Sequence, residues 1–221
     1  MTTPTSPALR LHGYFRSSAA YRVRIALHLK GLEYEHVGVH LLRNGGEQLS
    51  AEFRRINPLA LVPVLHCGDF ALSQSLAIME YLDDLHPTIP LLPNDPQLRA
   101  RARQFALTVA CDVHPLNNPR VVKFLSGRFG VDDAGKQEWI RHWIETAFEA
   151  LDPQLADASQ GRFCVGDEPT IADCCLVPQV FNARRFGVDV SRFQTISRID
   201  ATCQTIEAFQ RAHPAVQPDA E

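Results

Sequence analysis

Long apolar runs, a strong charge of either sign and metal-binding spacings are all missing from this 221-residue chain. No apolar run approaches the ~20 residues that a bilayer-spanning helix needs. Lys and Arg number 22 against 25 Asp and Glu, so the formal net charge is −3 and gives no global attraction to nucleic acid or an anionic membrane. The six cysteines form no CxxC pair and the nine histidines no HExxH motif, which argues against a metal centre and a disulfide framework.

What remains is a balanced globular composition. The length is enough to bury the core of one large domain or two modest ones. The cysteines are expected to be small buried apolar residues. The Thr/Ser/Pro-rich stretch Met1–Ala8 lacks the apolar segment of a signal peptide and is expected to be a disordered lead-in to a cytoplasmic protein. The tail, residues 214–221, is expected to be loose.

The first ninety residues alternate strand-like and helix-like segments. Strands are predicted at residues 9–14, 34–39, 62–65 and 70–72, and helices at 21–30, 47–56 and 76–85. Ser17 and Ser18 stand where a helix N-cap belongs, and Gly31 stands where that helix should end. The predicted order is βαβαββα.

The composition then changes. Four prolines between Pro87 and Pro96 mark a domain boundary. Beyond Gln97 the helical period dominates, which predicts helices at about 97–127, 135–157 and 171–186, with one or two more between 191 and 212. We therefore expect a small α/β domain over residues 8–88, a linker over 89–96 and an all-helical domain over 97–216.

Three features of the first half could carry chemistry. A strand that leads into the Ser17-Ser18 helix start presents free N–H groups, a positive dipole end and two hydroxyls, which together stabilise an anion such as a thiolate. The same serines also suit an ordinary helix cap. Gln74-Ser75 offers the same two interpretations at a second helix start. The proline of Val62-Pro63 enters a short strand and is compatible with a cis or a trans bond.

Three features of the helical half stand out as well. Two prolines and two asparagines interrupt the stretch from Cys111 to Arg120, which indicates either a bend or a site that uses the freed polar groups. Arg184 and Arg185 are adjacent and cannot share a helix face, so one of them is expected to face inward. Thr170 and Asp173 have the spacing of a capping box, which is a structural feature.

These motifs together resemble the zeta class of the glutathione S-transferase family. The resemblance covers roughly residues 9–218 and implies a thioredoxin-like N-terminal domain followed by an all-helical C-terminal domain, an α/β plus all-α fold. It rests on six separated motifs in the right order: residues 14–18 with 22–27, 57–58, 74–78, 165–167, 176–180 and 217–219.

The resemblance also implies the site residues, with glutathione as the cofactor. Ser17 and Ser18 would be catalytic and would support the glutathione thiolate, and Pro63 would be cis. The implied glutathione-binding residues are Ser17, Ser18, Gln48, Val62, Pro63, Gln74, Ser75, Asp112, His114 and Asn118, and those for the substrate carboxylates are Arg16, Arg120 and Arg185. The family often has a cysteine where this chain has Ala19, but the chemistry can be written without that thiol.

The implied activity is glutathione-dependent cis–trans isomerisation of maleylacetoacetate to fumarylacetoacetate, by reversible thiolate addition, in tyrosine and phenylalanine catabolism. Maleylpyruvate isomerisation in gentisate catabolism and a general zeta-class transferase or dehalogenase activity remain alternatives. A non-catalytic binding protein with the same fold is the competing class. The resemblance further implies a cytoplasmic homodimer that acts on a small enol-diacid, without metal, nucleic acid or membrane.

Overall fold

The computed structural model describes residues 8–158 and 161–221, which form two compact units. One unit is the described part of Met1–Ile89 together with Glu207–Glu221, and the other is Pro90–Ile206. The segment from residue 207 to 216, which the sequence placed in the helical domain, therefore groups with the first unit. The expected disordered lead-in lies, apart from Ala8, outside the described residues. No helix within the described ranges is long and apolar enough to cross a membrane.

The first unit is built on a four-stranded mixed sheet with the strand order β2-β1-β3-β4. Its strands are β1 (Leu9–Gly13), β2 (Glu35–Gly38), β3 (Val64–Cys67) and β4 (Phe70–Ser73). β2 runs parallel to β1, whereas β3 is antiparallel to both β1 and β4. The predicted βαβαββα order and thioredoxin-like fold are confirmed.

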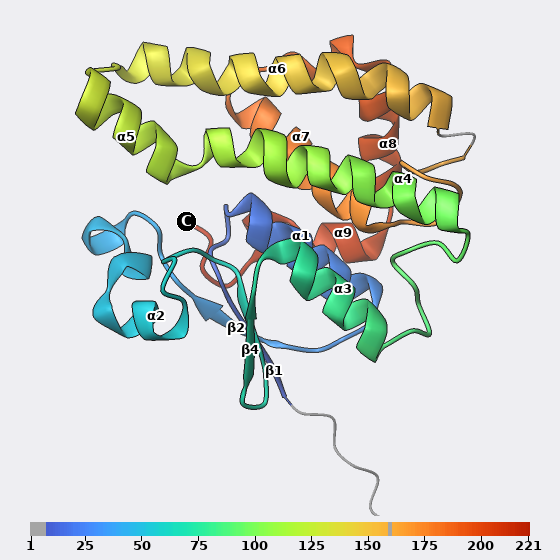
Figure 1. Ribbon diagram of the computed structural model, residues 1–221, viewed down its shortest axis with the longest axis horizontal. Helices are drawn as coiled ribbons and strands as arrows, with labels where there is room; N and C mark the ends of the chain where they lie inside the picture. Colours follow the sequence, from blue (N-terminus) through green and yellow to red (C-terminus); the bar gives the residue numbers. More distant parts are fainter. Residues whose placement is uncertain (1–7, 159–160) are drawn as a thin grey trace, which may run out of the picture. The chain divides into compact units, whose positions relative to one another are not determined.

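The helices of this unit are α1 (Ser18–Leu29), α2 (Ala51–Ile56), α3 (Ser75–Leu85) and α9 (Glu207–Ala212). α1 packs against α3 and against α9 (Figure 1). Apolar residues of β1, α1, β3 and α3 form a core that includes Leu11, Val23, Leu65 and Ile78. This core joins α1 and α3 to the sheet.

The predicted single helix over 47–56 is wrong. A short 3₁₀ turn covers Glu47–Leu49, and α2 begins only at Ala51. Ser50 separates the two because its backbone is extended and its hydroxyl accepts the N–H of Phe53, which makes it the N-cap of α2.

The second unit is helical, with α4 (Pro96–Leu107), α5 (Pro119–Phe129), α6 (Asp133–Ala158), α7 (Ile171–Arg185) and α8 (Gln194–Gln204). The single helix predicted over 97–127 is wrong, because the chain leaves α4 through a π-helical turn, Thr108–Val113, and a 3₁₀ turn, His114–Asn117. Pro115 and Pro119 lack the N–H that a continuous helix needs. Figure 1 shows α4 and α5 as separate helices connected by this break.

The predicted capping box at the start of α7 is confirmed. Asp173 Oδ2 accepts the N–H and the hydroxyl of Thr170, at 2.8 and 3.0 Å, and its Oδ1 accepts the N–H of Cys164 at 2.9 Å. All six cysteines are free. Those at 164, 174, 175 and 203 are buried as expected, whereas Cys67 is half-buried and Cys111 is exposed on the π-helical turn, contrary to the prediction.

Candidate functional site

The sheet register brings four loops of the first unit to one end of the sheet. Gly13 ends β1 and pairs with Gly38, which ends the parallel β2. His12 of β1 also pairs with Val64, which begins β3, and Val64 pairs with Ser73, which ends β4. Residues 14–17, 39–49, 62–63 and 74–75 therefore leave or enter the sheet at the same end. These loops contain Arg16, Ser17, Gln48, Val62, Pro63, Gln74 and Ser75.

Ser17 is the N-cap of α1. Its backbone is extended, and its Oγ accepts the N–H of Ala20 at 3.2 Å. A hydroxyl that accepts one hydrogen bond keeps its own hydrogen, so the cap leaves the Ser17 O–H able to donate. Within the described chain the N–H groups of Ser18 and Ala19 have no hydrogen-bond partner, as is usual in a first helical turn. The start of α1 can thus stabilise an anion while it is capped.

Arg16 lies beside Ser17 and is held by aromatic neighbours. Its Nη2 donates to the Tyr14 hydroxyl at 2.9 Å, and its guanidinium carbon lies 4.9 Å from the centroid of the Phe15 ring. Its Nε is buried and finds no partner among the described residues. The guanidinium therefore keeps an unused donor.

The other two loops at this end have unusual backbones. The Val62–Pro63 bond is cis, as the resemblance implied. Gln74 precedes α3 with φ +73°, a conformation that costs free energy for a residue other than glycine and is found preferentially at functional loops. The Gln74 side chain does not cap α3, and the Ser75 hydroxyl accepts from Arg22 Nη1 at 3.2 Å. The cap interpretation does not apply to Gln74.

Gln48 lies in the loop after β2. Its Nε2 reaches the carbonyl of Leu41 at 3.5 Å, and its Oε1 is buried without a partner among the described residues. Gly46 adopts φ +110°, and a Cβ at this position would lie 2.7 Å from Gln48 Nε2. A side chain at position 46 would therefore displace the Gln48 amide.

Two residues that hold these loops were not singled out from the sequence. Arg24 is fully buried, donates from Nε to the carbonyl of Ala212 at 3.0 Å and from Nη2 to the carbonyl of Phe15 at 2.9 Å. Burial lowers the pKa of Arg24 to about 10, so the guanidinium stays cationic at neutral pH. Asp219 accepts the N–H of Phe15 at 3.0 Å. Both lie in motifs that carry the resemblance, residues 22–27 and 217–219, but no role was predicted for either of them.

In the second unit the break between α4 and α5 carries three of the expected residues. Asp112 is exposed on the π-helical turn, and His114 begins the 3₁₀ turn. Asn118 caps α5, because its Oδ1 accepts the N–H of Arg120 at 3.0 Å. Such π-helical turns occur often at functional sites, which agrees with the interruption that the sequence indicated.

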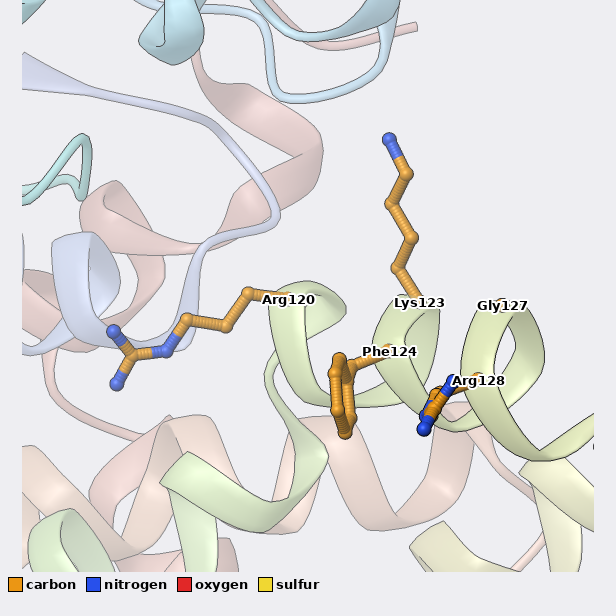
Figure 2. A pocket seen from close by; sticks show the side chains of 5 residues that line it. All are labelled: Arg120, Lys123, Phe124, Gly127 and Arg128. Atoms are coloured by element: carbon orange, nitrogen blue, oxygen red, sulfur yellow. The ribbon is translucent and has the colours of Figure 1, made fainter.

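Arg120 also lines an open pocket on α5 with a volume of about 430 Å³. The other lining residues are Lys123, Phe124, Gly127 and Arg128. Figure 2 shows Arg120 directed away from Phe124 and Arg128, with Lys123 on another side of the helix. Three of the five lining residues are cationic and none is acidic, so the pocket favours an anion.

The expectation that one arginine of the pair on α7 faces inward is wrong. Arg184 and Arg185 are both exposed. Arg184 Nη1 lies 2.7 Å from Oδ2 of the buried Asp200, and the Arg185 guanidinium lies 5.0 Å from the centroid of the Phe186 ring. Both residues fall in the last turn of α7, where each reaches the surface and where their charge complements the helix dipole.

The described ranges 8–158 and 161–221 contain no group of three or more His, Cys, Asp or Glu side chains that could hold a metal ion.

Two family models match the chain. One is described as the N-terminal domain of glutathione S-transferase and matches residues 16–85, and the other as its C-terminal domain and matches 137–217. A probable maleylacetoacetate isomerase from Vibrio cholerae is 49% identical over 96% of this chain and 99% of its own length.

Solved structures agree in fold. One is a holo maleyl pyruvate isomerase described as a bacterial glutathione S-transferase of the zeta class. It is 46% identical, with a TM-score of 0.93, over 96% of this chain and 100% of that one. Another is a maleylacetoacetate isomerase from Methylobacterium extorquens with bound malonate and GSH. It is 42% identical, with a TM-score of 0.92, over 96% and 99% of the two chains.

Proposed function

This chain belongs to the zeta class of the glutathione S-transferase family, and from that premise we propose that it is a glutathione-dependent cis–trans isomerase that converts maleylacetoacetate to fumarylacetoacetate. The observation that carries the proposal is the convergence of four loops at one end of the sheet, in a chain 49% identical to a probable maleylacetoacetate isomerase. The site roles below are parts of the same proposal.

The loops of the first unit fit glutathione. Its carboxylates and amides require donors and acceptors, and Gln48 keeps a buried Oε1 without a partner among the described residues. The N–H groups at the start of α1 are suited to an anionic sulfur. The residues that hold glutathione are Ser17, Ser18, Gln48, Val62, Pro63, Gln74 and Ser75 in this unit, with Asp112, His114 and Asn118 from the second.

Glutathione, when bound, supplies the thiolate that adds reversibly to the cis double bond. The hydroxyl of Ser17 donates to that sulfur, and the N-terminus of α1 favours its charged form, which lowers the thiol pKa. Ser18 adds a second hydroxyl in the first helical turn. Ala19 supplies no thiol, so the nucleophile comes from glutathione alone.

Arginines recognise the substrate. A guanidinium binds a carboxylate through two parallel hydrogen bonds, and a maleyl diacid has two carboxylates. Arg16 contributes its unused Nε to this recognition. Arg120 contributes a guanidinium from the cationic pocket on α5, and Arg185 contributes one from the end of α7. The same arginines suit maleylpyruvate, and the 46% identical maleyl pyruvate isomerase structure makes that compound the second candidate substrate.

The proposal includes a cytoplasmic homodimer in which Asp112 approaches the partner subunit's site. Phe70, the first residue of β4, is half exposed and packs on Tyr81, which leaves an aromatic surface for a partner. Light scattering of the purified protein gives the mass in solution, and a monomer would remove this part of the proposal alone.

The test is an absorbance assay with maleylacetoacetate and maleylpyruvate side by side, with and without glutathione. We expect turnover only with glutathione, and the better substrate assigns the reaction. Arg120→Ala should lower kcat/KM by about 100-fold, as expected for loss of a charge-assisted pair at a carboxylate. Arg101→Ala, at an exposed position on α4 with no assigned role, is the matched control and should change it less than about threefold.

Binding of glutathione without turnover of either compound would overturn the isomerase proposal. It would leave a general transferase or a binding protein. Both would be retained on a glutathione resin, but only the transferase would be active in a conjugation assay.

A further inference from the structure

The C-terminal tail was expected to be loose, and the structure shows that it is held. A 3₁₀ turn covers Pro214–Val216, and Gln217 is buried. Gln217 Nε2 donates to the carbonyls of Arg211 and His213, at 2.9 Å each. The last four residues, 218–221, continue from this anchor as a segment with little apolar burial. Polar contacts therefore determine where that segment lies.

The first such contact reaches the loop that carries Ser17. Asp219 Oδ2 accepts the N–H of Phe15, and Asp219 Oδ1 lies 2.9 Å from Nε2 of His36. The carbonyl of Phe15 accepts from Arg24. Phe15 is thus held through both of its peptide groups by residues from other elements. The N–H of Ser17 donates to the carbonyl of Tyr14 at 2.9 Å and carries this constraint to the cap of α1.

The second contact reaches the loop that carries Gln48. Glu221 Oε1 lies 3.1 Å from His40 Nε2 and 2.7 Å from Arg43 Nη2. His40 Nδ1 accepts the N–H groups of Leu42 and Arg43, so the ring keeps its proton on Nε2, the nitrogen that lies near the Glu221 carboxylate. His40 and Arg43 accordingly lower the pKa of the Glu221 carboxyl.

Two hydrogen bonds within the Gln48 loop join His40 to Glu47. Glu47 Oε2 accepts the N–H of His40 at 2.7 Å, and the N–H of Glu47 donates to the carbonyl of His40 at 2.8 Å. His40 therefore ties Glu221 of the tail to Glu47, the neighbour of Gln48. One short segment therefore contacts two of the four loops that the proposed function assigns to glutathione, the Ser17 loop and the Gln48 loop.

We propose that Asp219 and Glu221 are positioning residues for glutathione: the tail, residues 217–221, orders the Ser17 loop and the Gln48 loop before the ligand binds. This inference rests on the proposed function, which assigns those loops. Affinity rises when the ordering of a binding loop is completed in the free protein, because binding no longer bears that entropy cost. The tail contributes through the loops and touches no reacting atom.

The test compares wild type with Asp219→Ala, Asp219→Asn and a chain that ends after Gln217, which keeps the anchoring amide. Calorimetry measures the Kd for glutathione alone, and hydrogen exchange of the ligand-free protein measures the order of residues 13–18 and 40–49. Truncation and Asp219→Ala should each raise the Kd about tenfold, as expected for one charged hydrogen bond. They should also accelerate exchange in the contacted loops.

Asp219→Asn keeps an acceptor oxygen for the N–H of Phe15 and should recover most of the affinity. At saturating glutathione kcat should stay within about threefold of wild type for all variants, because the bound ligand restores the loop order. Glu33→Gln is the matched control. It removes a different contact of the C-terminal segment, the Arg211–Glu33 pair at 3.8 Å, which does not involve either loop.

Unchanged exchange in both loops, an unchanged Kd, or an equal rise in Glu33→Gln would each overturn the inference. If truncation prevents folding, the two Asp219 variants carry the same comparison. If wild type itself binds no glutathione, the proposed function fails, while exchange in the ligand-free protein still reports whether the tail orders the loops.

Discussion

Ser17 and Asn118 are both N-cap residues and both proposed site residues. Each side chain accepts a backbone N–H of the helix that follows, from Ala20 and from Arg120 respectively. The cap orders the first helical turn, and each side chain keeps a donor that the cap does not use. Substitution by alanine therefore removes both the helix cap and the donor that is available to a ligand. A substitution that keeps the capping oxygen but removes the donor distinguishes the two roles.

Asn118 allows that separation. Asn118→Ala should lower the free energy of unfolding by about 1 kcal/mol through loss of the cap, and should also lower kcat/KM. Asn118→Ser restores a capping oxygen but has no amide N–H₂, so stability should return to wild type while activity stays low. Thermal denaturation and steady-state kinetics measure the two effects. Recovery of both in the serine variant would show that Asn118 acts only as a cap.

Gly46 offers a test at the glutathione loop. Gly46→Ala would place a Cβ 2.7 Å from Gln48 Nε2, so we expect a displaced amide and a glutathione Kd raised about tenfold. Gly45→Ala is the matched control, because Gly45 also has a positive φ, +80°, but its Cβ would meet nothing within 4 Å. Both variants should lose about 1 kcal/mol of stability from backbone strain.

Only the Gly46 variant should lose affinity, as measured by calorimetry with glutathione. Equal losses in both variants would assign the effect to strain in the loop rather than to the position of Gln48.

At the scale of elements, the strands and most helices could be predicted from the spacing of apolar residues and from the capping, Gly and Pro residues at their ends. The strand around Leu11 and the helix around Ile78 have a clear apolar pattern that buries one face against the common core. The break between α4 and α5 was only half predicted. Its prolines indicated a bend, but a π-helical turn depends on backbone hydrogen bonds that no residue pattern specifies.

For the tail, the sequence predicted too little order rather than too much. Residues 214–221 have no apolar period, and a segment without one is expected to be loose. Their order comes from single polar contacts to chain segments about two hundred residues earlier, such as Asp219 to Phe15. Partners at that separation are determined by the packing of α9 on α1, which local pattern does not reveal.

At the scale of the whole molecule, the sequence could largely predict that the candidate site residues of the first unit meet at one end of the sheet. Strand order alone implies that loops after parallel strands leave one end of a sheet, and the resemblance named the residues in those loops. The role of Arg24 could not be predicted. A charged side chain is buried only where hydrogen-bond acceptors satisfy it, and the acceptors of Arg24, the carbonyls of Ala212 and Phe15, are known only from the structure. Residues 207–216 lie within the match to the C-terminal family model, and they nevertheless cluster with the first unit through contacts such as that of Ala212 with Arg24.

Buried histidines of the first unit make stability depend on pH. Burial lowers the pKa of four of its histidines, at 12, 28, 36 and 66. At His28, burial, and next the Arg211 charge, lower the pKa from 6.5 to about 4. The folded chain then binds fewer protons than the unfolded chain between these two values. Stability that is complete above pH 6.5 is lost as the pH falls towards 4.

His28→Gln should therefore flatten the loss of stability between pH 7 and pH 4.5. We expect a reduction of roughly 1–2 kcal/mol, below the full linkage value because the ring is only half-buried and solvent screens it. Urea unfolding at the two pH values measures the difference within each variant, so the lost contact with Tyr34 cancels. His142→Gln, at an exposed position, is the control. An unaltered slope in the His28 variant would mean that acid destabilises this unit through its other buried histidines.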